Sequence, residues 1–212
     1  MLVILASDLD ESAVDLTRRW ERHEAVMLTP RDLSTPGWSF DPLGSASTAV
    51  AGGARISSRD IRAVYVRRSA VFAEELIWIA AADRQYAAAE MTAFLFAWLS
   101  SLPVPVVNSP TPAALCGPGL RPAGWRALAR GMGIETAEPA ADGLHDVTLV
   151  GHHALGDPLG VAEARRLAAR TGLTTGRFSF AGVVPKLVGV SPFVDVADPA
   201  VCAALLSLFD LA

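Results

Sequence analysis

The N-terminal segment alternates apolar and amphipathic stretches, and this order constrains the fold more than any other feature. Residues 2–6 (LVILA) are continuously apolar, which is typical of a strand buried on both faces of a sheet. Residues 12–23 place apolar side chains at helical spacing, and residues 25–28 (AVML) predict a second strand. A strand, a helix and a strand at this spacing predict a βαβ unit with parallel strands. The sequence therefore predicts an α/β fold.

Further segments extend this sheet. Residues 61–66 and 105–107 predict strands, and residues 34–58, rich in Pro, Gly and Ser, predict a loop with a minor pair of edge strands at 48–50 and 54–57. Residues 80–101 predict a long helix that is apolar almost all round, as expected for a helix buried between layers.

A glycine- and proline-rich connection at residues 112–122 predicts a boundary between two domains, 1–115 and 116–212. The second half predicts a smaller α+β region with a strand hairpin turning near Gly182. Its expected helices are 122–132, 161–171 and 198–211, and its expected strands are 146–150, 178–181 and 187–190.

Charge and hydropathy exclude some classes of partner. The net charge is −4, and acidic and basic residues are mixed without a basic stripe, so nucleic acid is not expected as a partner. The most apolar stretch, residues 91–102, is too short to span a bilayer, which takes about 20 residues, and Pro103 follows it. The N-terminus lacks the pattern of a signal peptide. We expect a cytoplasmic protein without membrane partners.

Two arginines, Arg67 and Arg68, end a predicted buried strand, where α/β folds place ligand-binding groups. We favour a structural ion pair with Glu90, because a lone carboxylate on an apolar helix is costly to bury. The alternative is a carboxylate- or phosphate-binding role. Ser7 and Asp8 lie on the loop after the first strand, just before a predicted helix cap made by Ser12 and Asp15.

Other reactive side chains give weaker signals. His152 and His153 are adjacent, and on a strand their side chains would point to opposite faces, which disfavours a shared metal ion. Ser109 and Cys116 lack a histidine at a spacing that indicates an activated nucleophile. Cys116 and Cys202, the two cysteines, are expected to be reduced and buried.

Three stretches of the chain follow one another in a recognisable order. They are residues 2–12, a strand leading to an acidic loop; residues 64–68 (VYVRR), with Tyr86 and Glu90 on the following helix; and residues 106–110 (VVNSP). Together they resemble the ATP-grasp superfamily, and in particular the grasp-with-spasm, microviridin-ligase and RimK-type peptide ligases. The resemblance implies a pre-ATP-grasp (Rossmann-like) parallel sheet with flanking helices, followed by a reduced ATP-grasp lobe. It also implies a binding cleft at the strand ends that includes Asn108.

The second half departs from the ligase pattern. Such ligases present a lysine after the Asn-Ser-Pro turn, whereas residues 115–122 contain only Arg121 as a cation. Gly189 stands where the magnesium-binding Glu of the pattern would be, and Ser191 stands where the Asn would be. Glycine offers magnesium no side-chain ligand and serine offers a weak one. The chain also lacks, in this interpretation, most of the lobe that covers adenine.

The expected function is therefore a non-catalytic, ATP-grasp-like binding or accessory protein, a pseudoenzyme that partners a ligase or binds a peptide substrate in a biosynthetic pathway. No cofactor and no metal are expected. Two alternatives stay open: an ATP- and Mg-dependent peptide ligase whose site is atypical or completed in an oligomer, and a structural oligomerisation module. A homodimer is expected, because the final helix is apolar and alanine is abundant.

Overall fold

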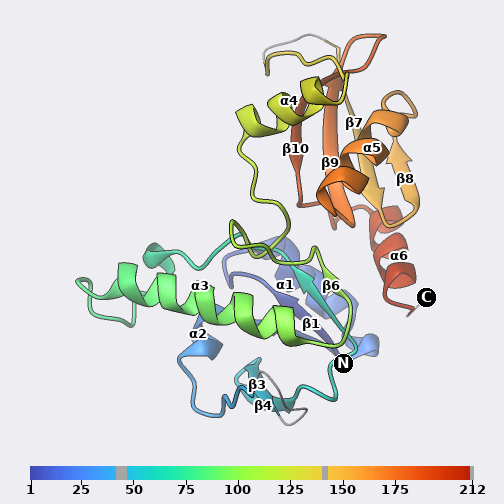
Figure 1. Ribbon diagram of the computed structural model, residues 1–212. Helices are drawn as coiled ribbons and strands as arrows, with labels where there is room; N and C mark the ends of the chain where they lie inside the picture. Colours follow the sequence, from blue (N-terminus) through green and yellow to red (C-terminus); the bar gives the residue numbers. More distant parts are fainter. Residues whose placement is uncertain (42–46, 140–142, 211–212) are drawn as a thin grey trace. The chain divides into compact units, whose positions relative to one another are not determined.

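The computed structural model describes residues 1–41, 47–139 and 143–210. The chain divides into two compact units, Met1–Cys116 and Gly117–Ala212. Each unit has its own main sheet, as Figure 1 shows. Each unit also has its own buried side chains.

The first unit contains a four-stranded parallel sheet in the order β2-β1-β5-β6. Its strands are β1 (Leu2–Leu5), β2 (Ala25–Leu28), β5 (Ala63–Val66) and β6 (Val106–Val107). Every residue of β1 and β5 is buried, because these two strands occupy the centre of the sheet. The parallel sheet predicted from the apolar segments is confirmed.

Helix α1 (Glu11–Arg19) follows β1 and is followed by the short 3-10 helix η1 (Glu21–His23). The cap at its start is Asp10, whose carboxylate accepts a hydrogen bond from the Ala13 N–H at 3.0 Å. The prediction that Ser12 caps this helix was wrong, because the helix begins one residue earlier than the apolar pattern indicated. Asp15 instead pairs with Arg18 on the exposed surface.

Two short strands, β3 (Thr48–Ala51) and β4 (Ala54–Ser57), form an antiparallel hairpin apart from the main sheet. They confirm the edge strands expected in this segment. The short helix α2 (Pro30–Leu33) was not predicted. The Asp32 carboxylate caps its start by accepting hydrogen bonds from the N–H and the hydroxyl of Thr29.

Helix α3 (Arg84–Ser101) is the longest element of the chain and runs beside the sheet (Figure 1). The prediction that it is buried all round was wrong. Its described buried residues are Ala88, Leu95, Trp98 and Leu99. The opposite side is exposed and is built from alanine with Tyr86 and Glu90. Alanine favours a helix and tolerates water, so an alanine-rich helix reads as apolar without being buried. The 3-10 helix η2 (Ala73–Glu75) lies between β5 and α3.

The second unit contains an antiparallel sheet in the order β10-β9-β7-β8. Its strands are β7 (Leu144–Val150), β8 (His153–Gly156), β9 (Thr175–Ala181) and β10 (Lys186–Ser191), and its helices are α4 (Pro122–Gly131), α5 (Val161–Thr171) and α6 (Pro199–Leu208). Apolar side chains of α4 and α5 form one buried cluster with side chains of β7, β9 and β10.

The predicted β9–β10 hairpin is confirmed, and β8 was missed because His153–Gly156 carries no clear apolar alternation. The last helix ends at Leu208, three residues before its expected end at 211, which lies outside the described residues. Among the helices of the described ranges, none has the length and apolar character needed to cross a bilayer.

Candidate functional site

The carboxyl ends of β1 and β5 bring together the acidic loop after β1 and the two arginines after β5. Because parallel strands end at the same edge of a sheet, these loops become neighbours although they are far apart in sequence. The Arg67 Nε lies 2.9 Å from an Asp10 carboxylate oxygen, and the Arg67 side chain is only 9% exposed. Its guanidinium carbon lies 5.9 Å from the centre of the Tyr65 ring. Burial by itself would lower the pKa of Arg67, but Tyr65 and Asp10 outweigh it and the pKa is raised.

Arg68 is still more deeply buried, with 3% of its side chain exposed, and forms an ion pair with Glu75. Its guanidinium also donates to the backbone carbonyls of Ala70 at 2.8 Å and Ala6 at 3.3 Å. Burial lowers the pKa of Arg68, while the carboxylates of Glu75 and Asp8 oppose that shift. The guanidinium is thus compensated by groups of the protein itself.

The Glu75 carboxylate is a hub of hydrogen bonds. It accepts from the Phe72 N–H at 3.1 Å, from the Ser7 hydroxyl and from Arg68. Burial would raise the pKa of Glu75, but these donors outweigh it and hold the pKa below its ordinary value of 4.5. The carboxylate is therefore ionised at neutral pH.

These contacts correct the expected partner of the arginines. We predicted a structural ion pair with Glu90, but Glu90 is exposed on α3, and the partners are Asp10 and Glu75. The exposed side of α3 needs no compensation for a carboxylate, so the cost that led us to pair Glu90 does not arise.

The other predicted site residues are dispersed. Ser7 is at the strand end beside Glu75, and Asp8 is exposed next to it. Asn108 is buried, with 1% exposure, directly after β6 at the same edge of the sheet. Arg121 belongs to the second unit, where it is exposed and precedes the first residue of α4.

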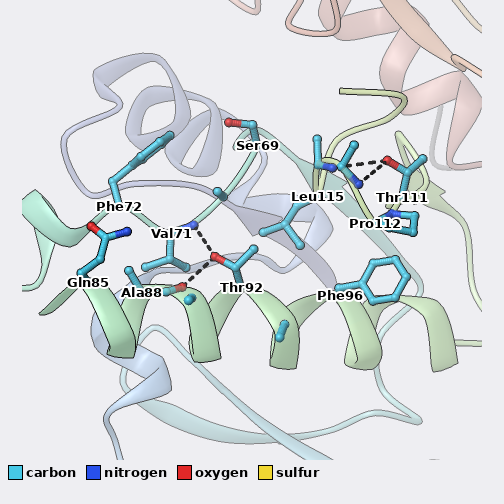
Figure 2. Close-up of a pocket in the computed structure, with 15 residues that line it drawn as sticks. Ser69, Val71, Phe72, Gln85, Ala88, Thr92, Phe96, Thr111, Pro112 and Leu115 are labelled. Atoms are coloured by element: carbon cyan, nitrogen blue, oxygen red, sulfur yellow. Dashed lines mark hydrogen bonds between the residues drawn. The ribbon is translucent and has the colours of Figure 1, made fainter. Parts of the chain in front are cut away.

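A pocket of about 610 Å³ lies in the first unit, beside the strand ends. It is formed by three segments: residues 69–72 after β5, the side of α3 from Gln85 to Phe96, and residues 111–115 after β6. Figure 2 shows α3 as its floor, with Phe72 and Gln85 at one end and Phe96 and Pro112 at the other. None of the 15 lining residues is ionisable, and most are alanine, valine, leucine or phenylalanine. Its size and character are those of a ligand-binding pocket.

The buried arginine Arg68 organises one wall of this pocket. Its Nε donates to the Ala70 carbonyl, and its partner Glu75 accepts from the Phe72 N–H, so both ends of the 70–72 segment are fixed by the ion pair. The Thr92 hydroxyl joins the wall to the floor, because it accepts from the Val71 N–H at 3.0 Å and donates to the Ala88 carbonyl at 2.8 Å (Figure 2). Arg68 and Glu75 thus hold this wall in place without lining the pocket themselves.

The pocket was not predicted from the sequence. Its floor is recognisable in retrospect as the small side chains Ala88, Ala89, Thr92 and Ala93, which follow one another at helical spacing. That pattern predicts one face of a helix, but it does not predict the segments that form the walls of the pocket. The pocket exists because residues 69–72 and 111–115 follow neighbouring parallel strands and come to lie over the same side of α3.

The positions that resemble a ligase's magnesium ligands do not fit that role. Gly189 has no side chain, and the Ser191 hydroxyl is occupied locally, since it accepts from the Phe193 N–H at 3.1 Å and donates to the Phe193 carbonyl. The single lysine of the chain, Lys186, is half-exposed and 3.2 Å from Glu135. Within the described residues, no group of three or more His, Cys, Asp or Glu side chains could hold a metal ion. Gly189 and Ser191 therefore offer magnesium no anionic oxygen.

The candidate nucleophiles are inert in this geometry. Burial raises the pKa of the Cys116 thiol to about 12, so it carries almost no thiolate at neutral pH. Ser109 is exposed and bonds to the Val106 carbonyl. The expectation that His152 and His153 point to opposite faces was wrong, since their ring centres lie 4.0 Å apart. His152 lies in the turn before β8, so the alternation of side chains along a strand does not apply to it.

Comparison with solved structures shows that the chain has an ATP-grasp-like fold, as predicted. It is similar to the macrocyclase MdnC from Microcystis aeruginosa MRC, solved with the precursor peptide MdnA, at a TM-score of 0.73 and 12% identity over 99% of each chain. It is also similar to the ATP-grasp ligase PsnB complexed with minimal precursor, Mg and ADP, at a TM-score of 0.69 and 15% identity over 99% of this chain and 98% of that chain.

A third similar structure is the RiPP-associated ATP-grasp ligase of Chryseobacterium gregarium, in complex with ADP and a leader and core peptide. Its TM-score is 0.59 at 10% identity, over 99% of this chain and 94% of that chain. No family model and no curated protein matches the sequence. At identities this low the likeness establishes the fold. We expected most of the lobe that covers adenine to be missing from this chain. The chain covers 94–99% of these three neighbours, so the comparison does not support that expectation.

Proposed function

We propose that the protein is a non-catalytic member of a peptide-modification pathway that binds a peptide with an ATP-grasp-like fold. The observation that carries this proposal is the state of the strand-end arginines: Arg67 and Arg68 are both buried and both already neutralised, by Asp10 and Glu75. An arginine that is compensated in this way stabilises the fold and has no charge left for a triphosphate.

Two further observations support it. The residues at the positions of the magnesium ligands offer no anionic oxygen, as described above for Gly189 and Ser191. The structural neighbours MdnC and PsnB are both complexed with precursor peptides. A protein that retains the scaffold without the ion chemistry can hold a peptide, or a partner ligase, but has no means to activate a carboxylate with ATP.

The test measures whether the protein binds or hydrolyses nucleotide. We expect no rise in melting temperature with ATP and magnesium at millimolar concentration, because only a ligand bound by the folded state stabilises it. We also expect no hydrolysis of ATP above the rate of a blank. A rise in melting temperature that requires both ATP and magnesium would overturn the proposal.

Such a rise would favour the alternative, a ligase that completes its site in an oligomer or through Arg121. The neighbour PsnB is complexed with Mg and ADP, which supports keeping this alternative in the test. An Arg121→Gln variant separates the two forms: loss of the ATP effect in this variant assigns the phosphate contact to Arg121. The homodimer stays a prediction, and light scattering at several concentrations tests it.

A further inference from the structure

The pocket over α3 has a chemical character that narrows what it can bind. Its lining contains no Asp, Glu, Lys, Arg or His, so it offers no counter-charge to a phosphate, a carboxylate or an amine. Burying an unpaired charge there would be strongly unfavourable. The pocket is therefore complementary to an uncharged, largely apolar occupant.

Of the four polar side chains that line the pocket, two are used within the protein and two, Ser69 and Gln85, can bond to an occupant. The hydroxyls of Thr92 and Thr111 are used within the protein, by Val71 and Ala88 and by Ala113 and Ala114. Within the residues that the structure describes, the Ser69 hydroxyl and the Gln85 amide make no hydrogen bond, and both line the pocket. A hydroxyl and an amide can each donate and accept, which suits the N–H and C=O groups of a peptide backbone.

The dimensions indicate how much peptide fits. The floor extends from Gln85 to Phe96 along α3, which at the helical rise corresponds to about 17 Å. An extended chain covers that distance in about five residues. In an extended segment, every second side chain points to the same side, so two apolar side chains two positions apart would both enter the pocket. Phe72 and Phe96 lie at its two ends, and two such side chains, about 7 Å apart, fit between them.

We propose that this pocket binds a short uncharged peptide segment carrying two apolar side chains at alternate positions, with Ser69 and Gln85 bonding its backbone. The inference rests on the proposed peptide-binding function and specifies the site and the chemistry of the segment. It also explains why the wall at residues 70–72 is fixed by the buried pair Arg68 and Glu75, since a preformed pocket binds without the cost of ordering its wall.

The experiment uses the full chain and a fluorescein-labelled peptide set of the form GSXSZSG. The varied positions X and Z are drawn from Phe, Leu, Met, Gln, Glu and Lys, and binding is measured by fluorescence anisotropy. We expect peptides with Phe, Leu or Met at both positions to bind at least about tenfold more tightly than those with Glu or Lys.

The alanines of α3 provide a matched pair of variants. Ala93 lines the pocket, whereas Ala97 is exposed on the same helix and does not. Ala93→Leu fills the floor and is expected to weaken binding of the apolar peptides by at least about tenfold, and Ala97→Leu is expected to leave it unchanged. Leucine is almost as good a helix former as alanine, so both variants should keep the wild-type circular dichroism and melting temperature.

Four results would overturn the inference. Three of them are the binding of no peptide of the set, equal binding of charged and apolar peptides, and an unchanged affinity in Ala93→Leu. Conversion of a dimer to a monomer by Ala93→Leu alone would show that a second copy occupies the pocket, and would overturn it too. Failure of the proposed function is separate, because it appears as stabilisation by ATP and magnesium whatever the peptides do.

Discussion

Replacing Glu75 with glutamine tests whether the buried ion pair holds the first unit together. The Arg68 and Glu75 side chains are 3% and 13% exposed, so the variant leaves a guanidinium buried without its counter-charge. Breaking a buried pair on one side costs about 3–5 kcal/mol. Glutamine keeps one oxygen that can accept from Arg68, so we expect the lower end, a loss of about 3 kcal/mol in the free energy of unfolding.

The assay is urea denaturation of wild type and Glu75→Gln at pH 7, followed by tryptophan fluorescence and circular dichroism. The control is Asp15→Asn, which breaks the Asp15–Arg18 pair, whose side chains are 65% and 75% exposed. Exposed pairs contribute little, so the control should lose less than about 0.5 kcal/mol. If Glu75→Gln were as stable as Asp15→Asn, the Arg68–Glu75 ion pair would not stabilise the first unit, and the reasoning would be refuted.

The stability that Glu75 contributes should also depend on pH. The folded-state pKa of Glu75 lies below its ordinary value of 4.5, so ionised Glu75 stabilises the fold fully above pH 4.5. This contribution is lost as the pH falls through the lower, folded-state value. The difference in stability between wild type and Glu75→Gln should therefore be constant from pH 7 to pH 5 and shrink in more acidic buffer. A difference that grows on acidification would contradict the sign of the shift.

Two further predictions concern backbone space and thiol access. Gly131→Ala should raise the free energy of unfolding by about 0.5–1 kcal/mol, because Gly131 is helical and its new Cβ meets no atom within 4 Å. Gly156→Ala should lower it by at least about 2 kcal/mol, because φ is +91° there and the Cβ would lie 2.5 Å from the Asp146 carbonyl oxygen. Equal urea midpoints for these two variants would contradict this. Cys116 and Cys202 should not react with Ellman's reagent at pH 8 until the protein unfolds, since both are buried and the pKa of Cys116 is about 12. Rapid labelling of the native protein would contradict the burial.

Local sequence patterns predicted the elements better than they predicted the contacts. Side-chain periodicity and turn residues, which act over a few positions, predicted β1, β2, β5, α5 and the β9–β10 hairpin. The burial of α3 was overestimated, because alanine contributes to an apolar composition without requiring burial.

The candidate site shows the limit more clearly. The sequence indicated that Arg67 and Arg68 end a buried strand and favoured an ion pair with a carboxylate, for which it suggested Glu90. Both arginines form ion pairs, but with other partners. The sequence did not identify Asp10 and Glu75, because the choice depends on which loops meet at the edge of the sheet. Glu75 lies seven residues after Arg68, in the short 3-10 helix η2, which side-chain periodicity does not predict.

What the sequence alone determined is the α/β class, most of the strands, and the residue types at each position: Arg121 is the single cation of residues 115–122, and Gly189 and Ser191 carry no carboxylate. These depend on residue types and local spacing. What only the tertiary structure decided is where the charges are neutralised and where space remains. The pocket is bounded by segments 69–72, 85–96 and 111–115, and its walls meet because parallel strands deliver their following loops to one edge of the sheet.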